Sequence, residues 1–395
     1  MADTFKVLTL NSISGVGLKR FPPERYQVGN EVKAPDAILV RSHDMHKMDI
    51  PSQVKVIGRA GAGTNNIPVE KMNERGVPVF NAPGANANAV KELVIAGLLI
   101  AARNLKPALD FVGGLKGDDK AINLVVEQGK KQFSGTELPR HSLGVIGLGK
   151  IGSLVADAAI KLGMNVIGYD PEITVDAAWS LPSQVKKAHS IEEVLKSCEY
   201  VTMHVPLLDL TRNLINAERL KLMKPGAILL NFSREGIVDN AVVVEALAAK
   251  HLRHYVCDFP ARALLGQPQV IALPHLGAST REAEDNCAVM VVDQVREFLE
   301  NGNIVNAVNF ANVAMARESP YRIGIANANV PNMLGQISTA MAKAGLNIHN
   351  MLNKSRGEMA YTLVDVDSAV TPEVVTRIGE IDGVLSVRYL PLEGH

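Results

Sequence analysis

The chain has 395 residues, of which 47% are hydrophobic and 21% charged; this balance is typical of a folded globular protein, and the length favours two or three domains. Lysine plus arginine and aspartate plus glutamate both number 41, so the neutral formal charge argues against nucleic acid or an anionic membrane as a partner. The longest apolar run, residues 93–102, is too short to cross a bilayer, and the N-terminus lacks the pattern of a signal peptide.

The three cysteines are Cys198, Cys257 and Cys287, an odd number without the spacing of metal ligands. We therefore expect small buried thiols in a reducing compartment. The composition as a whole predicts a cytoplasmic protein with no metal site.

Short apolar stretches alternate with polar ones over residues 6–80, at "FKVLTL", "AILVRS", "VKVIGRAGAG" and "VPVFNAPG". This alternation predicts β/α units around a parallel sheet. The following stretch, "NAVKELVIAGLLIAARNL", has the length and composition of a largely buried helix, with Asn86 or Asn88 as its N-cap.

A second β/α series begins at "HSLGVIGLGKIG" and continues through "MNVIGYD", "YVTMHVP", "GAILLNFS", "HYVCDF" and "QVIALP". Helix-like stretches separate these strands, as in an open doubly wound sheet. A helix is then predicted over roughly residues 281–300, ended by Asn301 and Gly302. The simplest topology returns this helix to the first sheet, which makes the first domain discontinuous.

Residues 311–320, "ANVAMARESP", are predicted as a linker. Residues 321–392 follow the pattern strand, helix, strand, strand, helix, strand, which predicts a small ferredoxin-like βαββαβ unit. The sequence thus predicts an α/β protein of three modules: residues 1–96 with 285–316, residues 97–284, and residues 320–395.

A glycine-rich loop, "GLGKIG", lies between a predicted strand and a predicted helix. In such a G-x-G-x-x-G loop Gly147 permits the tight turn, Gly149 lets the backbone approach a pyrophosphate, and Gly152 lets the helix pack on the strand. The helix N-terminus adds N–H groups and a partial positive charge. The pattern is weak alone, but this context predicts a dinucleotide site.

Asp170 ends the next predicted strand, close to the expected spacing of about 20 residues. It would accept hydrogen bonds from both ribose hydroxyls and repel a 2′-phosphate, and no arginine follows it, so NAD is favoured over NADP. The predicted cofactor ligands are Gly147, Gly149, Lys150, Ile151, Gly152, Asp170, His204, Val205, Pro206, Ser233, Asp258 and Gly277.

Two residues after strand ends carry the predicted chemistry, because ligands of open α/β sheets bind at the carboxyl ends of strands. Arg234, in "NFSREG", can hold the carboxylate and carbonyl oxygen of an α-keto acid. His275, in "PHLGAS", can protonate that carbonyl oxygen as hydride arrives. Each alone is more often a surface or turn residue. Together, after a dinucleotide loop, they predict a dehydrogenase.

The motifs "VIGLGKIG", "HVPL…TRNLIN", "MKPGAILLNFSREGIVD" and "PHLGAST" resemble, in order and spacing, those of the D-isomer-specific 2-hydroxyacid dehydrogenases. The resemblance covers residues 6 to about 310. Within the family, "ILVRS", "RAGAGTNNIPVEKMNERGVPVFNAPG" and the C-terminal unit, which resembles an ACT domain, are similar to the branch that acts on D-3-phosphoglycerate.

The resemblance implies a flavodoxin-like substrate domain, a Rossmann-type NAD domain and an ACT domain. It also implies NAD-dependent conversion of D-3-phosphoglycerate to 3-phosphohydroxypyruvate, the first step of phosphorylated L-serine synthesis. Two alternatives stay open: a dehydrogenase of another small D-2-hydroxyacid, and a weakened NAD-sensing or NAD-binding protein on the same fold. The family also implies a homo-oligomer, with dimers formed through the NAD domain and the ACT unit extending them to a tetramer.

By the same resemblance, Arg234 matches the substrate-binding arginine and His275 the acid/base. Arg41 matches an arginine that binds the substrate phosphate, Asn86 lies near the nicotinamide, and Arg59 is either a second phosphate ligand or an ordinary surface arginine. Backbone N–H groups would bind the substrate carboxylate at Ala60, Gly61, Ala62 and Gly63.

The family supports its histidine with a glutamate in the pattern D-F-P-x-E, and here "CDFPARALLGQPQ" places Arg262 at that position. A carboxylate orients the imidazole and stabilises its protonated form, whereas an arginine has the opposite effect. Either Asp258 replaces the glutamate after a local shift, or Arg262 faces solvent and activity is reduced, or activity is lost. We expect reduced activity, and expect Arg262→Glu to raise turnover and move the pH optimum upward.

The stretch "RIGIANANVPNMLGQISTAMAKAGLNIHNM" resembles the effector site of an ACT domain. The serine-binding loop N-x-P-G-x-L corresponds to residues 329–334, where Asn332 replaces glycine and still tolerates a positive φ. The resemblance implies an L-serine site that includes Asn327, Asn329 and Asn347, although Asn327 stands where histidine is frequent. The alternative is an ACT pair that only holds subunits together.

Overall fold

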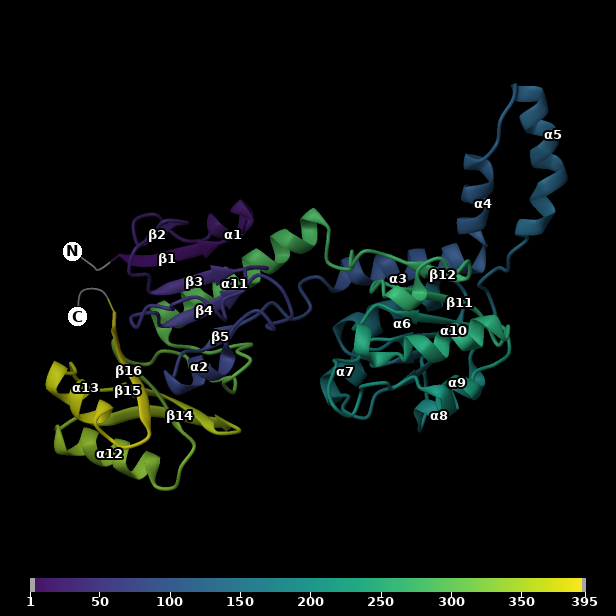
Figure 1. Cartoon of the computed structure of the whole chain (residues 1–395). Helices are drawn as coiled ribbons and strands as arrows, with labels where there is room; N and C mark the ends of the chain where they lie inside the picture. The colour runs from purple at the N-terminus through teal and green to yellow at the C-terminus, as the bar shows by residue number, and fades with distance from the viewer. Residues whose placement is uncertain (1–3, 393–395) are drawn as a thin grey trace. The chain divides into compact units, whose positions relative to one another are not determined.

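The computed structural model describes residues 4–392, except for the side chain of Asp176. These residues form two compact units (Figure 1). Unit 1 consists of the described residues up to Asn86 and from Arg281 onward, and unit 2 is Ala87–Thr280. The described residues contain three sheets, one for each predicted module. The residue boundaries of the modules stay a prediction.

Unit 1 contains a parallel sheet in the order β2-β1-β3-β4-β5, the flavodoxin-like order expected for the first module. The helix that follows the His275 loop returns to this sheet as predicted, and its valines share a core with β1, β3 and β4. The elements are β1 (Phe5–Leu10), α1 (Gly15–Leu18), β2 (Tyr26–Gly29), β3 (Ala37–Val40), β4 (Val56–Arg59), α2 (Val69–Glu74), β5 (Val79–Phe80) and α11 (Arg281–Asn301).

Unit 1 also contains the C-terminal antiparallel sheet, in the ferredoxin-like order β14-β15-β13-β16. One face packs on α12 and α13, and the other contributes Ala326, Tyr361 and Leu363 to the core that contains α11. The elements are β13 (Tyr321–Ala328), α12 (Met333–Lys343), β14 (Ile348–Arg356), β15 (Met359–Val366), α13 (Pro372–Gly379) and β16 (Val384–Pro391). The ACT-like module therefore shares a hydrophobic core with the flavodoxin-like sheet.

The prediction of a linker over residues 311–320 is wrong for part of that stretch. Val313 and Met315 are buried in the shared core, and Val313 pairs with Ile304 through two backbone hydrogen bonds. The stretch has no clear helix or strand pattern, but its alternate apolar side chains Val313 and Met315 are buried.

Unit 2 is a parallel sheet in the order β12-β11-β10-β9-β6-β7-β8, which contains the Rossmann order 3-2-1-4-5-6 when its strands are counted from β6. Helices α3 and α6 cover one face, and α8, α9 and α10 cover the other. The strands are β6 (Ser142–Ile146), β7 (Asn165–Tyr169), β8 (Lys186–Lys187), β9 (Tyr200–Met203), β10 (Ala227–Asn231), β11 (Leu252–Cys257) and β12 (Val270–Ala272). The helices are α3 (Ala87–Ala102), α4 (Leu105–Gly113), α5 (Asp119–Gly129), α6 (Lys150–Lys161), α7 (Val175–Trp179), α8 (Ile191–Ser197), α9 (Ala217–Lys221) and α10 (Asn240–Ala248).

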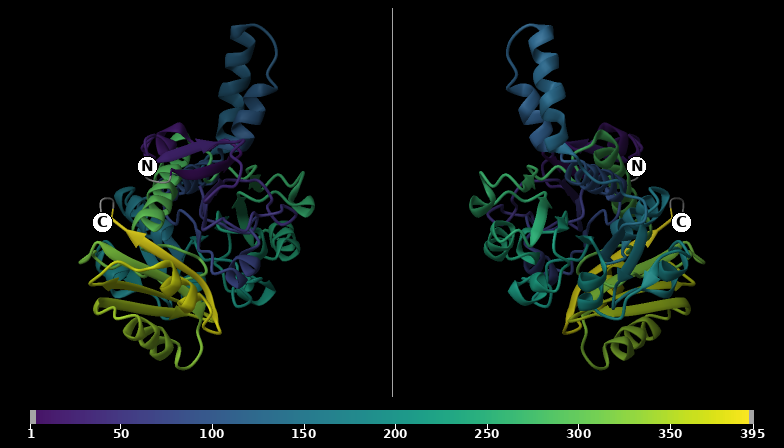
Figure 2. Two further views of the ribbon diagram at one scale, coloured as in Figure 1. Left: turned by 90° about the vertical axis from the view of Figure 1, so that its left-hand side faces the viewer. Right: turned by 90° about the vertical axis from the view of Figure 1, so that its right-hand side faces the viewer.

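Helices α4 and α5 form a hairpin that extends away from the sheet of unit 2 (Figures 1 and 2). Neither helix contains a buried residue, although each has an apolar face.

The three cysteines are buried free thiols, as predicted, and burial raises the pKa of Cys198 to about 12. In the described part of the chain, no helix combines the length and apolarity needed to span a bilayer.

Candidate active site

The glycine loop after β6 has the geometry expected of a dinucleotide cradle. Gly147 has φ +90°, and a Cβ at Gly152 would lie 1.9 Å from the carbonyl oxygen of Gly147, so both positions require glycine. A Cβ at Gly149 would meet nothing within 4 Å. Gly149 precedes the first turn of α6, where Lys150 and Ile151 begin the helix, so open space lies beside an anion-attracting helix N-terminus.

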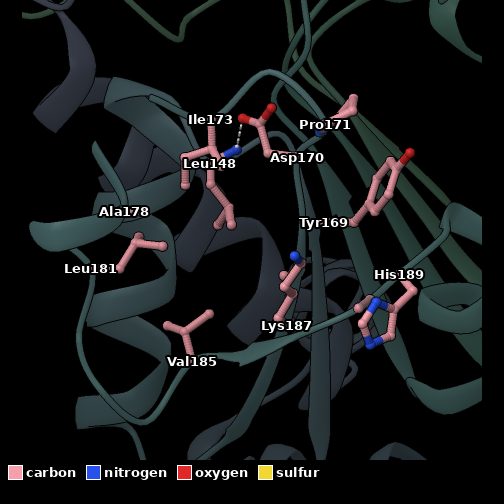
Figure 3. Close-up of a pocket in the computed structure, with 12 residues that line it drawn as sticks. Leu148, Tyr169, Asp170, Pro171, Ile173, Ala178, Leu181, Val185, Lys187 and His189 are labelled. Atoms are coloured by element: carbon pink, nitrogen blue, oxygen red, sulfur yellow. Dashed lines mark hydrogen bonds between the residues drawn. The ribbon is translucent and has the colours of Figure 1, made fainter. Parts of the chain in front are cut away.

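Asp170 follows β7 and is held by the backbone around it. Its Oδ2 accepts a hydrogen bond from the N–H of Leu148 at 2.8 Å (Figure 3). Its Oδ1 accepts a hydrogen bond from the N–H of Glu172 at 2.9 Å. A carboxylate has about four acceptor positions, so both oxygens keep capacity for ribose hydroxyls. The carboxylate is thus fixed beside the glycine loop, as a dinucleotide site requires.

A cavity of about 500 Å³ adjoins Asp170, and Figure 3 shows its lining. Its apolar wall includes Leu148, Ile173 and Val185. Lys187 and His189 line the same cavity, and sequence reasoning missed both. Neither residue stands close to Asp170 in the sequence; Lys187 reaches the site because β8 pairs with β7, and His189 follows two residues later.

His204 follows β9, next to the glycine loop. Burial lowers the pKa of His204 to about 3, so its ring is neutral. One ring nitrogen, Nε2, lies 3.0 Å from Oγ1 of Thr202, while the buried Nδ1 has no partner within the described structure. A hypothetical Cβ on Gly147 would meet the His204 carbonyl oxygen at 2.6 Å and Val205 at 2.9 Å. The strand end and the loop therefore pack against each other, and the buried Nδ1 of His204 has no hydrogen-bond partner within the described structure.

Three other predicted cofactor residues have structural partners. The hydroxyl of Ser233 donates to the carbonyl oxygen of Met203, which ties the ends of β9 and β10 together. The carbonyl oxygen of Pro206 accepts from the hydroxyl of Thr211. The N–H of Gly277 donates to Asp258. These hydrogen bonds hold the loops at the strand ends in place.

The His275 loop is held by Asp258. The buried Asp258 carboxylate accepts the N–H groups of Leu276 and Gly277, both at 2.7 Å. His275 itself has φ +58°, a left-handed conformation that is uncommon outside glycine and often marks functional positions. Its exposed ring meets the edge of Phe259, with the ring centroids 5.0 Å apart.

Arg234 and His275 line one cavity of about 700 Å³ in unit 2. The structure thus brings together the two residues predicted to carry the chemistry. Arg234 is exposed, and its Nη1 donates to the carbonyl oxygen of Ser233. Arg212, Glu235 and Asp239 line the same cavity and were not predicted as site residues.

Arg262, at the family's glutamate position, lies in a 3-10 turn over Arg262–Leu264. It is exposed and does not belong to the lining of the His275 cavity. Both oxygens of Asp258 are engaged by backbone N–H groups. Of the three alternatives weighed from the sequence, this geometry favours a solvent-facing Arg262.

In unit 1, the predicted phosphate ligands have protein partners. Arg41 pairs with Glu284 of α11, with Nη2 2.7 Å from Oε1. Arg59 donates from Nε to Asn66, and Asn66 donates to the carbonyl oxygens of Arg41 and His43. Asn66 was not predicted, because nothing in its sequence context shows that it joins two strand ends.

Of the four backbone N–H groups predicted to bind the substrate carboxylate in unit 1, two already donate to other backbone groups. The N–H of Ala60 donates to Val40 and that of Gly61 to Arg59. Among the described residues, the N–H groups of Ala62 and Gly63 make no hydrogen bond. Asn86, which was also predicted to bind the substrate, lies immediately before α3 and is partly exposed.

The predicted effector residues differ in their surroundings. Asn327 is buried in β13, and its Oδ1 has no partner within the described structure. Asn329 is exposed and donates to the carbonyl oxygen of Gly357, and the backbone N–H of Asn347 donates to Asp367. Asn332 has φ +62°, which confirms that asparagine supports the turn in place of glycine.

Comparison with known proteins agrees with this geometry. Residues 95–277 match the family described as D-isomer specific 2-hydroxyacid dehydrogenase, NAD binding domain. A D-3-phosphoglycerate dehydrogenase of Methanocaldococcus jannaschii is 35% identical over 348 residues, which cover 85% of this chain. The matched region spans 62% of that relative's length, so the relative is the longer protein.

A D-3-phosphoglycerate dehydrogenase of Haemophilus influenzae is 33% identical, and the match covers 83% of this chain and 79% of the relative. The NAD⁺-bound 3-phosphoglycerate dehydrogenase of Entamoeba histolytica has a similar structure, with a TM-score of 0.59 and 25% identity over 78% of this chain and 99% of that chain. Members of the family are oxidoreductases that act on a CH–OH group with NAD or NADP. The chain belongs to the D-isomer-specific 2-hydroxyacid dehydrogenase family.

Proposed function

We propose that the protein is an NAD-dependent dehydrogenase that interconverts D-3-phosphoglycerate and 3-phosphohydroxypyruvate, the first step of phosphorylated L-serine synthesis. The observation that carries this proposal is the single cavity that joins Arg234 to His275 in the unit that holds the dinucleotide loop. The choice of substrate is supported by the relatives of that name at 35% and 33% identity.

The chain's own residues account for binding and proton transfer. The bound nicotinamide supplies the hydride chemistry. The Arg234 guanidinium presents a planar fork that matches the carboxylate and carbonyl oxygen of the keto acid. His275 donates a proton to the carbonyl oxygen in reduction and accepts it from the hydroxyl in oxidation. Asp258 keeps the histidine loop in its left-handed conformation by accepting the two N–H groups that follow.

The cofactor is assigned as NAD because the Asp170 carboxylate repels a 2′-phosphate. Lys187 lines the neighbouring cavity and provides a positive charge that favours a phosphate. The two charges act in opposite directions on cofactor choice. Asp170 is held next to the glycine loop by two backbone hydrogen bonds, whereas Lys187 is exposed, so the carboxylate is expected to dominate.

A second candidate function is the dehydrogenation of a D-2-hydroxyacid without a phosphate. The Arg41–Glu284 ion pair favours it, because a carboxylate already neutralises the proposed phosphate ligand. The retained Arg234 and His275 argue against a protein that only binds NAD.

The test is NADH oxidation with 3-phosphohydroxypyruvate, compared with hydroxypyruvate and with NADPH, across pH and with excess L-serine. A strong preference for the phosphorylated substrate and for NADH is expected, together with inhibition by serine. Turnover of hydroxypyruvate alone would establish the second function. Tight NADH binding without turnover of either substrate would contradict both functions.

The partner proposed for the α4–α5 hairpin is a second copy of this chain. Its exposed apolar side chains include Leu109 at 70%, Val112 at 58% and Leu124 at 60% exposure, more than an isolated helical hairpin in water favours. Light scattering is expected to show a dimer or tetramer, and Leu109→Lys with Leu124→Lys to yield smaller species. An unchanged mass in that variant would exclude the hairpin as the interface.

A further inference from the structure

We propose that Glu235 is the carboxylate that positions His275 in this chain, in place of the acidic residue that is missing at Arg262. This inference rests on the proposed function, since it takes His275 as the group that transfers the proton. Glu235 is the residue after Arg234 and lines the same cavity as Arg234 and His275.

An acid/base histidine generally needs a carboxylate close to its ring. A histidine that acts as an acid needs its ring orientation and its protonated form stabilised, and a carboxylate facing the ring does both. The cavity contains two guanidinium groups, Arg212 and Arg234, that oppose a positive charge on His275. A carboxylate facing the same cavity offsets that repulsion.

Among the described residues of unit 2, Glu235 and Asp239 line the His275 cavity and Asp258 binds the His275 loop, and two of these three carboxylates are already engaged. Asp258 accepts two backbone N–H groups of the loop, at Leu276 and Gly277. Asp239 is the N-cap of α10, where its Oδ1 accepts the first N–H groups of that helix. Glu235 has no hydrogen bond or ion pair among the described residues. By elimination, Glu235 is the carboxylate free to interact with the imidazole.

The negative charge of Glu235 affects a thiol at the carboxyl end of β11. Burial raises the pKa of the Cys257 thiol, and the Glu235 carboxylate adds to that rise. Cys257 is the last residue of β11, which lies between β10, the strand before Glu235, and β12, the strand before His275. The Glu235 carboxylate therefore lies near enough to the carboxyl end of β11 to influence a side chain there.

The direct test is Glu235→Gln, which keeps the shape of the side chain and removes its charge. The protonated imidazole is required for reduction, so loss of the carboxylate should move the decline of the reduction rate to lower pH by about one unit. The rise of the oxidation rate should move in the same direction. At a pH above the decline, the reduction rate should fall roughly tenfold while NADH affinity is unchanged.

Two controls separate positioning from other effects of the charge. Arg262→Gln removes a charge from an exposed position outside the cavity lining and should leave both pH profiles in place. In an Arg212→Gln background, Glu235→Gln should still shift the profiles. If the shift disappears there, Glu235 serves only to neutralise Arg212, and the proposal is wrong.

Titration of the His275 ring by NMR gives a readout that does not depend on turnover. The midpoint in Glu235→Gln should lie about one pH unit below that of the unaltered protein. Equal midpoints would overturn the role of Glu235 even if the protein is an active dehydrogenase. A shifted midpoint in a protein without turnover would instead contradict the proposed function and leave the influence of the Glu235 charge on His275 established.

Discussion

Two groups of charged side chains in the described part of the chain differ in their surroundings. In unit 1, Arg322 and Asp365 are completely buried between the ACT-like sheet and α11. In unit 2, Arg234, Glu235 and His275 line a cavity and are exposed. The first cluster is closed to water, and the second is open to a ligand.

Every nitrogen of the buried Arg322 guanidinium has an acceptor. Arg322 donates to both oxygens of Asp365 and to the carbonyl oxygens of Asn301, Met315 and Ala316. Two further arginines reach the last turn of α11, where helix carbonyls lack partners within the helix. Arg388 donates to the carbonyl oxygens of Phe298 and Leu299, and Arg317 to that of Glu300. The buried charges thus join the ACT-like module to α11.

The exposed cluster is different, because Glu235 has no partner in the described structure and Arg234 has one backbone contact from its guanidinium. The comparison shows which charges support the fold and which are available for chemistry. A buried charge is stable only when its hydrogen bonds are complete. A charge that binds a substrate must keep part of its capacity free.

The largest effect is expected from Asp365→Ala, because this change leaves the buried Arg322 charge without its partner. We expect a loss of about 3–5 kcal/mol from the free energy of unfolding, measured by chemical denaturation. The matched control is Asp293→Ala, which removes the partner of Arg20 in an exposed ion pair of similar length. The control should change stability little. Equal losses in the two variants would contradict the distinction between the clusters.

The second-largest effect is expected from a substitution in the glycine loop, on the affinity for NADH. Gly152→Ala places a Cβ where the carbonyl oxygen of Gly147 lies, so the loop must move. NADH affinity should fall roughly a hundredfold, corresponding to about 3 kcal/mol, in a fluorescence titration. Gly149→Ala provides the comparison, because a Cβ at this position meets no protein atom within 4 Å. This variant should fold as the unaltered protein does, and its methyl group should only obstruct the approach of the cofactor. Unchanged affinity in Gly152→Ala would show that the loop is not the dinucleotide site.

The smallest effect is expected from Glu284→Gln, which releases Arg41 from an exposed ion pair. Such pairs contribute about 0.2–1 kcal/mol, so the KM for 3-phosphohydroxypyruvate should fall by at most about fivefold. The KM for hydroxypyruvate should stay the same, because it has no phosphate. Glu282→Gln, on the same first turn of α11, is the control. An equal change for both substrates would remove Arg41 from phosphate binding.

The sequence predicted the parts of the site that depend on local pattern. Gly147 and Gly152 are required by the path of their own loop, and the structure shows the contacts that exclude a side chain there. Arg234 and His275 were found because they follow strands whose ends meet at one edge of a parallel sheet. Lys187 was missed because β8 is short and polar and does not resemble a buried strand.

By itself, the sequence determined the two β/α series, the C-terminal βαββαβ unit, the dinucleotide loop and the pair that carries the proposed reaction. These features follow from hydrophobic periodicity and from residues that stand next to one another in the chain. Only the tertiary structure decided which carboxylates are engaged, that Arg262 lies outside the cavity, and that buried arginines join the ACT-like module to α11. Those outcomes depend on contacts between distant residues, such as Arg322 with Asp365 and Arg41 with Glu284, which no local pattern records.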